Sequence, residues 1–335
     1  MVAERVGLTD ITIVYNRPGV KGREGKIWGE LVPYGYTYQG FGTSKAAPWR
    51  AGANEGTTME FSTDVTINGK NLSAGKYGFF IATGRDSSTL IFSKNNTAWG
   101  AFYYDSTEDA LRVTCRQVPV EQPQEFLLYS FRDQTLNSAV IALTWEKMMF
   151  PFKVETDVNK NQVAFFRKEL QTDKGFSSQA FVQAATWCAD NNINLEEALR
   201  WAEAAISEQY IGERNFRTLS TKARILDLMG KQQEAAALMK EAAALGSAME
   251  VHGYARHLQS TKKNSEAAAV FRANYKKYPN TFTTNVGMVR ALSSEGKFKE
   301  ALTYATAAQA QAPDELNKTS VATMIEKLKL GKDIN

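Results

Sequence analysis

Alternation of polar and apolar residues dominates the first half of the chain and predicts β-strands. Segments 10–16 (DITIVYN) and 57–67 (TTMEFSTDVTI) place apolar side chains at alternate positions, and the second stops at the turn pair Asn68-Gly69. Similar strands are expected over 75–83, 88–94, 110–118, 125–131 and 138–148. Because no helical period separates these segments, we expect antiparallel pairing in a β-sandwich or a flattened barrel.

The second half changes to a helical period. Four alanine-rich segments each contain a Glu-Ala pair, and the pairs begin at Glu197, Glu234, Glu266 and Glu300, so the intervals are 37, 32 and 34 residues. Paired helices with a period near 34 residues are the signature of tetratricopeptide repeats. Residues 176–312 therefore resemble that family, although the inter-repeat proline is missing from the first repeats. We expect a solenoid closed by a capping helix over 320–330, with a joining helix over 158–172.

These two patterns predict two segregated domains of an α+β protein. An antiparallel β-sandwich is expected over residues 1–155 and a tetratricopeptide-like helical domain over 156–335, and 15 of the 23 glycines fall in the former. At 335 residues, the chain is long enough for each domain to bury its own core. There is no apolar run near 18 residues, so we expect no membrane span.

Charge and the scarcity of histidine narrow the function. Residues 1–155 carry 16 basic and 16 acidic side chains, and the net charge of +4 resides in the second half, which is too little to predict nucleic-acid binding. The only histidines are His252 and His257, which we expect on a helix surface or between repeats. We therefore predict no catalytic residue, no metal site and no cofactor. Cys115 and Cys188 are expected to be buried free thiols, and their number leaves the redox compartment open.

The stretch PWRAGANE, residues 48–55, is the strongest candidate site in the first half. Its guanidinium suits a carboxylate or phosphate and its indole suits a sugar ring, with side chains of an earlier segment alongside. The candidate ligand-binding residues are Arg17, Lys21, Trp28, Tyr34, Trp49, Arg50, Asn54 and Glu55. The competing interpretation is structural: Arg50 pairs with Glu55 or another carboxylate and pins the loop, while Trp49 and Trp28 plug the core. A calcium-binding turn at Asp105, Glu108 and Asp109 is a weaker alternative.

Four motifs of the first half occur together in one known family. They are RPGVKGREGKIWG (17–29), LVPYG (31–35), WRAGANE (49–55) and WGAFYYD (99–105). Residues 7–120 thus resemble a domain-of-unknown-function family common in exported proteins of Bacteroidetes, with extra residues at 36–48. The resemblance implies a β-sandwich-like fold and a periplasmic or secreted location. The chain shows no signal peptide, as expected also for a mature or engineered start.

Three functions fit these patterns. The leading one is a non-enzymatic binding or scaffold protein of the cell envelope, whose repeats present a concave surface to a protein or peptide partner. The second is a carbohydrate-directed binding or hydrolytic module that uses the Trp49-Arg50/Glu55 loop, because glycoside hydrolysis needs two carboxylates and no histidine. The third is a structural subunit of an envelope complex, which the sequence does not separate from the first.

Overall fold

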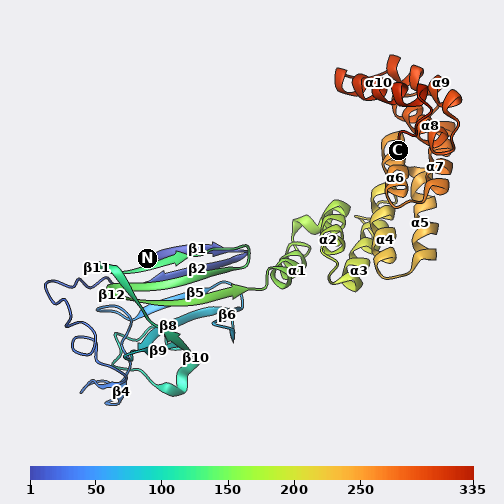
Figure 1. Cartoon of the computed structure of the whole chain (residues 1–335). Helices are drawn as coiled ribbons and strands as arrows, with labels where there is room; N and C mark the ends of the chain where they lie inside the picture. The colour runs from blue at the N-terminus through green and yellow to red at the C-terminus, as the bar shows by residue number, and fades with distance from the viewer. The chain divides into compact units, whose positions relative to one another are not determined.

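The structure, a computed structural model, describes all residues from 1 to 335 and divides into two compact units (Figure 1). These units are Met1–Phe165 and Phe166–Asn335. The division lies later than the boundary at 155 that composition predicts. Helix α1 (Val158–Glu169) explains the difference, because Asn161 in its first turn hydrogen-bonds back to strand residue Thr156 at 2.8 Å.

Two antiparallel sheets and a small ribbon make up the first unit. The six-stranded sheet has the order β1 (Val2–Val6), β2 (Thr9–Val14), β5 (Thr57–Phe61), β8 (Gly75–Ala82), β9 (Ser87–Ser93) and β10 (Asp109–Arg116). The four-stranded sheet has the order β11 (Val118–Arg132), β12 (Ser138–Thr156), β6 (Val65–Ile67) and β7 (Lys70–Leu72). A ribbon of β3 (Thr37–Tyr38) and β4 (Ala46–Ala47) and a short helix, η1 (Ser106–Glu108), complete the unit.

The core of the β unit lies between its two sheets. Phe79 of β8 stacks on Phe152 of β12 with ring centroids 5.8 Å apart, and it meets the edge of Tyr129 from β11 at 6.3 Å. All three side chains are buried. Alternate positions of each strand point inward, so the predicted antiparallel sandwich is confirmed.

One predicted strand is divided between the two sheets. Segment 57–67 forms β5 in the first sheet and β6 in the second, with a bend over residues 62–64. The alternation continues through the bend because both strands face the same core, so periodicity alone does not reveal the crossing. The turn at Asn68-Gly69 is confirmed: it joins β6 to β7, and both residues have positive φ, 46° and 78°.

The second unit is a stack of helical hairpins. Its helices are α2 (Ser178–Asp190), α3 (Leu195–Ser207), α4 (Phe216–Leu228), α5 (Gln232–Leu245), α6 (Ala248–Ser260), α7 (Asn264–Lys277), α8 (Phe282–Ser294), α9 (Phe298–Ala310) and α10 (Glu315–Lys329). A short helix, η2 (Asp173–Phe176), precedes them. Each helix packs on the next along the chain, and α2 also contacts α4 as α6 contacts α8, so the even-numbered helices form one layer.

Local capping signals recur with the repeat and set the helix ends. Capping boxes begin α4, α6 and α8 at Asn215, Ser247 and Thr281. Gly230 and Gly296 end α4 and α8 with φ of 80° and 75°, as the sequence predicts for a helix-ending glycine. The tetratricopeptide-like architecture therefore follows from this chain's own helices, and α10 occupies the position expected for the capping helix.

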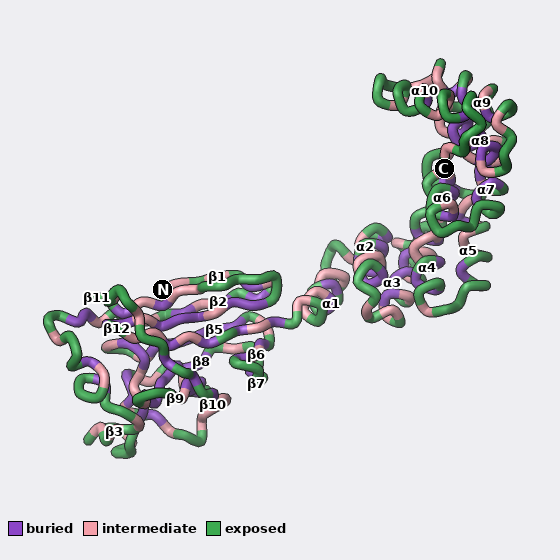
Figure 2. Tube along the Cα trace, in the orientation of Figure 1, coloured by how far each residue is buried: buried purple, intermediate pink, exposed green.

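Small side chains allow the paired helices to approach closely. Ala198, Ala235, Ala267 and Ala301, the alanines of the four Glu-Ala pairs, are all buried. Figure 2 shows buried residues on the inner faces of the helices and along the strands, and exposed residues in the turns. No helix is both long and apolar enough to pass through a membrane.

Candidate functional site

Trp49 ties the loop 48–55 to the β core. Its backbone exchanges two hydrogen bonds with Ile81, and its indole N–H donates to the Gly52 carbonyl oxygen at 3.1 Å. Its ring stacks on Trp145 with centroids 6.0 Å apart and lies edge-on to Trp28 at 5.7 Å. These three indoles form one aromatic cluster, so the Trp49 ring is used in internal packing.

Arg50 and Glu55 do not pair. The Glu55 carboxylate accepts a hydrogen bond from the side-chain amide of Asn16, whereas Arg50 forms no ion pair. The Arg50 Nε is buried and has no hydrogen-bond partner, and burial lowers the pKa of the guanidinium. Asn54, with φ of 57°, takes the left-handed backbone expected of it. The loop is therefore held by backbone and indole contacts, without the predicted Arg50–Glu55 pair.

The remaining candidate residues have partners of their own. The Arg17 Nε donates to the Leu127 carbonyl oxygen at 2.8 Å, and Lys21 donates its backbone N–H to Glu125 at 3.0 Å. The Tyr34 ring lies under the guanidinium of Arg85, 5.6 Å from the ring centroid. Among the predicted residues the structure thus joins Trp28 to Trp49 and gives Arg17, Lys21 and Tyr34 contacts elsewhere.

The acidic turn that follows the WGAFYYD motif holds itself together. Asp105 caps η1, Glu108 accepts from the Asn95 side chain at 3.1 Å, and Asp109 forms an ion pair with Arg112. Nowhere in the chain do three or more His, Cys, Asp or Glu side chains converge as a metal ion would need. The observed contacts favour the structural interpretation of this turn over a calcium site.

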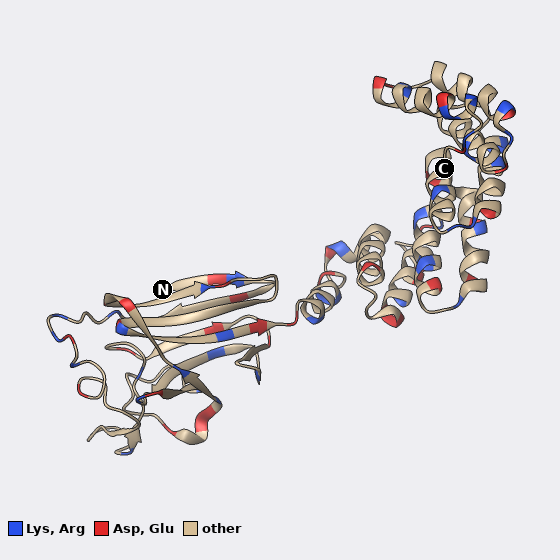
Figure 3. Ribbon diagram, in the orientation of Figure 1, with Lys and Arg blue, Asp and Glu red and all other residues tan.

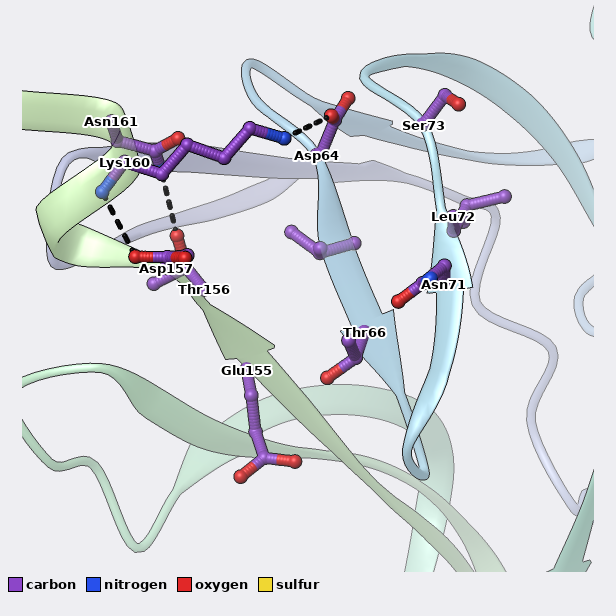
Figure 4. A pocket seen from close by; sticks show the side chains of 11 residues that line it. Asp64, Thr66, Asn71, Leu72, Ser73, Glu155, Thr156, Asp157, Lys160 and Asn161 are labelled. Atoms are coloured by element: carbon purple, nitrogen blue, oxygen red, sulfur yellow. Dashed lines mark hydrogen bonds and ion pairs between the residues drawn. The ribbon is translucent and has the colours of Figure 1, made fainter. Parts of the chain in front are cut away.

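A polar cavity of about 540 Å³ lies within the β unit, where β12 passes into α1 beside the β6–β7 hairpin. We call it the junction cavity; its lining is Asp64, Val65, Thr66, Asn71, Leu72, Ser73, Glu155, Thr156, Asp157, Lys160 and Asn161. Figure 4 shows Lys160 extending from α1 to Asp64, an ion pair of 3.1 Å that remains largely exposed. Such pairs are screened by water, so the cavity has little fixed charge to select a ligand.

A cluster of hydroxyl groups lies beside the junction cavity. The Thr9 hydroxyl is 2.6 Å from that of Thr63 and 2.7 Å from that of Thr156. The Asn161 side-chain amide donates to Thr63 at 3.0 Å and to Thr156 at 2.8 Å. This network joins α1 to both sheets and satisfies its own polar atoms, which is the arrangement of a structural joint.

The second unit carries a pocket of about 220 Å³ across the even-numbered layer of helices. We call it the repeat-face pocket; its lining is Met249, His252, Arg256, Phe282, Thr283, Val286, Arg290, Asn317, Ser320, Val321 and Met324. These residues come from α6, α8 and α10, so three helices in three successive hairpin positions contribute. The lining combines apolar side chains with three basic ones and includes no Asp or Glu.

Burial and like charge act together on the basic residues of this pocket. Burial lowers the pKa of His252 to about 4, and the nearby Arg290 and Arg256 lower it further. The Arg290 guanidinium also has a lowered pKa, chiefly from burial and then from Arg256. His252 packs against the ring of Phe271 at 5.2 Å, which confirms the inter-repeat contact expected of it. Elsewhere on the repeats, acidic and basic side chains alternate (Figure 3).

Residues 1–154 match the family described as "Protein of unknown function (DUF2911)". The matched DUF2911 segment contains both sheets apart from the last two residues of β12, and it includes the loop 48–55. The sequence resemblance is thereby confirmed for the first half of the chain. No curated protein matches the chain.

Solved structures resemble the repeat unit that follows the DUF2911 segment. YrrB, titled a TPR protein with an unusual peptide-binding site, has a TM-score of 0.32 at 16% identity over 50% of this chain and 85% of its own. MamA from Desulfovibrio magneticus RS-1 has a TM-score of 0.30 at 16% identity over 48% and 95%. The Cut9–Hcn1 hetero-tetramer of APC/C has a TM-score of 0.34 at 11% identity over 52% and 33%. These likenesses are too distant to bear on function.

Sequence reasoning concentrated on the DUF2911 segment and missed the repeat-face pocket. A signal was available in the repeat period: Arg256 and Arg290 are separated by 34 residues, as 290 minus 256, so they occupy equivalent positions in neighbouring repeats. His252 precedes Arg256 by four residues, which places both on one helix face. Three basic residues on the same layer mark the pocket.

Proposed function

We propose that this protein is a non-enzymatic binding or scaffold protein whose helical repeats hold a protein or peptide partner on the face formed by α6, α8 and α10. The observation that carries the proposal is the repeat-face pocket, because it spans three helices and combines apolar with unneutralised basic side chains. A surface of that kind buries apolar area while fixing the orientation of a charged group. The β unit serves as a rigid module attached to the repeats.

The carbohydrate alternative has less support. It depends on the Trp49 indole and the Glu55 carboxylate, yet Trp49 stacks within the aromatic cluster and Glu55 is engaged by Asn16. Sugar binding needs an aromatic face open to the ligand, and the contacts of Trp49 use that face internally.

A cell-envelope location forms part of the proposal. Its support is the resemblance of residues 7–120 to a family common in exported proteins. Fractionation of the source cells with an antibody against the β unit tests this location. Recovery with the cytoplasmic marker fraction would contradict it, and recovery with the periplasmic or secreted fraction is expected.

Site-specific photo-crosslinking tests the binding surface. A benzophenone amino acid replaces Met249 on α6 or Ser320 on α10, both exposed at the repeat-face pocket. The matched controls carry it at exposed Ala269 on α7 or Thr303 on α9, in the other layer of helices. We expect one discrete crosslinked partner from the first pair and none from the controls. Equal crosslinking at all four positions, or at none, would contradict binding on this face.

A further inference from the structure

The repeat-face pocket has an apolar half and a basic half. Met249, Phe282, Val286, Val321 and Met324 supply the apolar part of its lining. The basic part comes from the side chains of His252, Arg256 and Arg290. A ligand that fills the pocket must therefore present an apolar group and a negative charge close together.

The positive charge in the pocket is not neutralised within the chain. Neither Arg256 nor Arg290 forms an ion pair, and the Arg290 Nε is buried without a hydrogen-bond partner. The Arg290 Nη1 donates at 3.3 Å to the side-chain oxygen of Asn335, which is an uncharged acceptor. A buried donor left unpaired costs about 1–3 kcal/mol, so an anionic acceptor at this position is strongly favoured.

The helices that form the pocket direct their N-terminal turns toward it. Met249 and Phe282 lie in the first turns of α6 and α8, and Asn317 lies in the first turn of α10. The partial positive charge of a helix N-terminus adds to that of the two guanidiniums. All of these features favour an anion and disfavour a cation.

The size of the pocket limits the ligand to one residue's side chain and a carboxylate. A volume of about 220 Å³ accommodates a single large apolar side chain beside a small anion. In an extended peptide successive side chains point to opposite faces, so an internal Asp or Glu does not place its carboxylate beside the next apolar side chain. Only at a C-terminus do a carboxylate and an apolar side chain share one Cα atom.

We propose that the repeat-face pocket binds the C-terminal residue of a partner peptide, with Arg290 and Arg256 holding its terminal carboxylate and the apolar half holding an aliphatic last side chain. Arg290 approaches with the fork geometry that suits a carboxylate. The inference rests on the proposed function and names the chemistry of the partner. The exposed Arg256 adds charge at the rim.

N-acetyl-leucine is the minimal probe, because it carries the apolar side chain and the carboxylate on one Cα atom. Its binding to the full chain is followed through the Nε–Hε nuclear magnetic resonance signal of Arg290, assigned by its loss in Arg290→Lys. We expect saturable shifts with a Kd of about a few millimolar, the range for a ligand of this size. N-acetyl-leucinamide, which lacks the charge, should bind at least tenfold more weakly.

Two further probes distinguish the source of the anion. The amide of N-acetyl-glutamate offers only a side-chain carboxylate, and inorganic phosphate offers charge without an apolar group. Both are expected to bind more weakly than N-acetyl-leucine. Tighter binding of either probe, or no shift of the Arg290 signal with N-acetyl-leucine, would overturn the proposal.

Matched variants confirm the location. Arg256→Gln removes an exposed charge at the pocket, and Arg217→Gln removes an exposed charge from α4 in the same layer. We expect Arg256→Gln to weaken N-acetyl-leucine binding about fivefold and Arg217→Gln to leave it unchanged. Equal effects would show non-specific attraction. Crosslinking through Met249 that persists in Arg290→Gln would separate a failed carboxylate site from a failed binding face.

Discussion

Lys262 shows how the repeat constrains a single backbone position. It follows α6 with φ of 64°, at the position that Gly230 and Gly296 occupy after α4 and α8. A side chain with a Cβ atom is strained in this left-handed conformation, and glycine is not.

Lys262→Gly should therefore stabilise the repeat unit by about 0.5–1 kcal/mol, since relief of strain exceeds the entropy that glycine adds to the unfolded state. Urea unfolding followed by circular dichroism at 222 nm measures the change. The converse variant, Gly296→Lys, should destabilise by a similar amount, because open space surrounds Gly296 and only the backbone conformation is affected. Destabilisation by Lys262→Gly would refute this account.

His252 makes the repeat unit sensitive to mild acid. Its pKa is lowered to about 4 in the folded state, from 6.5, by burial and by Arg290 and Arg256. Between pH 6.5 and 4 the unfolded state therefore binds a proton that the folded state does not, and stability falls as the pH falls.

We expect a loss of up to about 3 kcal/mol across this window. His252→Gln should abolish most of it, as measured by unfolding at a series of pH values. The Glu295 carboxylate, with its pKa lowered to about 2 by Arg272 and Lys297, stabilises the fold above pH 4.5 and loses that effect only at lower pH. An unchanged profile in His252→Gln would show that another group titrates.

Helix α1 shows what an element needs beyond its own periodicity. Its boundaries were predicted from the sequence within a few residues, yet its attachment depends on Asn161 and the hydroxyl groups of Thr9, Thr63 and Thr156. These residues are far apart in the chain, so no local pattern indicates that they meet.

Asn161→Ala should destabilise the β unit by about 1–3 kcal/mol, because it leaves partly buried hydroxyl groups without their donor. Thermal unfolding monitored by tryptophan fluorescence gives the value. Lys160→Ala, one residue earlier, removes only an exposed ion pair and should change stability by less than about 0.5 kcal/mol. Similar effects of the two substitutions would argue against a structural joint at Asn161.

At the scale of the whole molecule, the sequence predicted the two architectures because each has its own period. Strand β1 was missed, since its five residues alternate too briefly, and segment 57–67 was predicted as one strand because both sheets bury the same face. The candidate loop was found from unusual residue types, but the Trp28–Trp49–Trp145 contacts depend on tertiary structure. The repeat-face pocket likewise needs the stacking of helices before its basic residues converge.

The two units have separate hydrophobic cores, so they should unfold as separate cooperative transitions. Phe79→Ala lies in the β core and Phe271→Ala in the repeat core, and each should cost about 3–5 kcal/mol in its own unit. Differential scanning calorimetry of the full chain should show one transition shift while the other stays in place. A single transition displaced by both substitutions would demonstrate strong coupling.

The segment after α10 has a consequence for any affinity measured on this protein. Ser293 accepts a hydrogen bond from the Ile334 backbone, and Asn335 bonds to Gln259 and Arg290, so residues 333–335 lie against α6 and α8 beside the repeat-face pocket. A tethered segment competes at an effective concentration in the millimolar range. Titrations of the intact chain would then report exchange of one occupant for another, and tags are better placed at the opposite terminus.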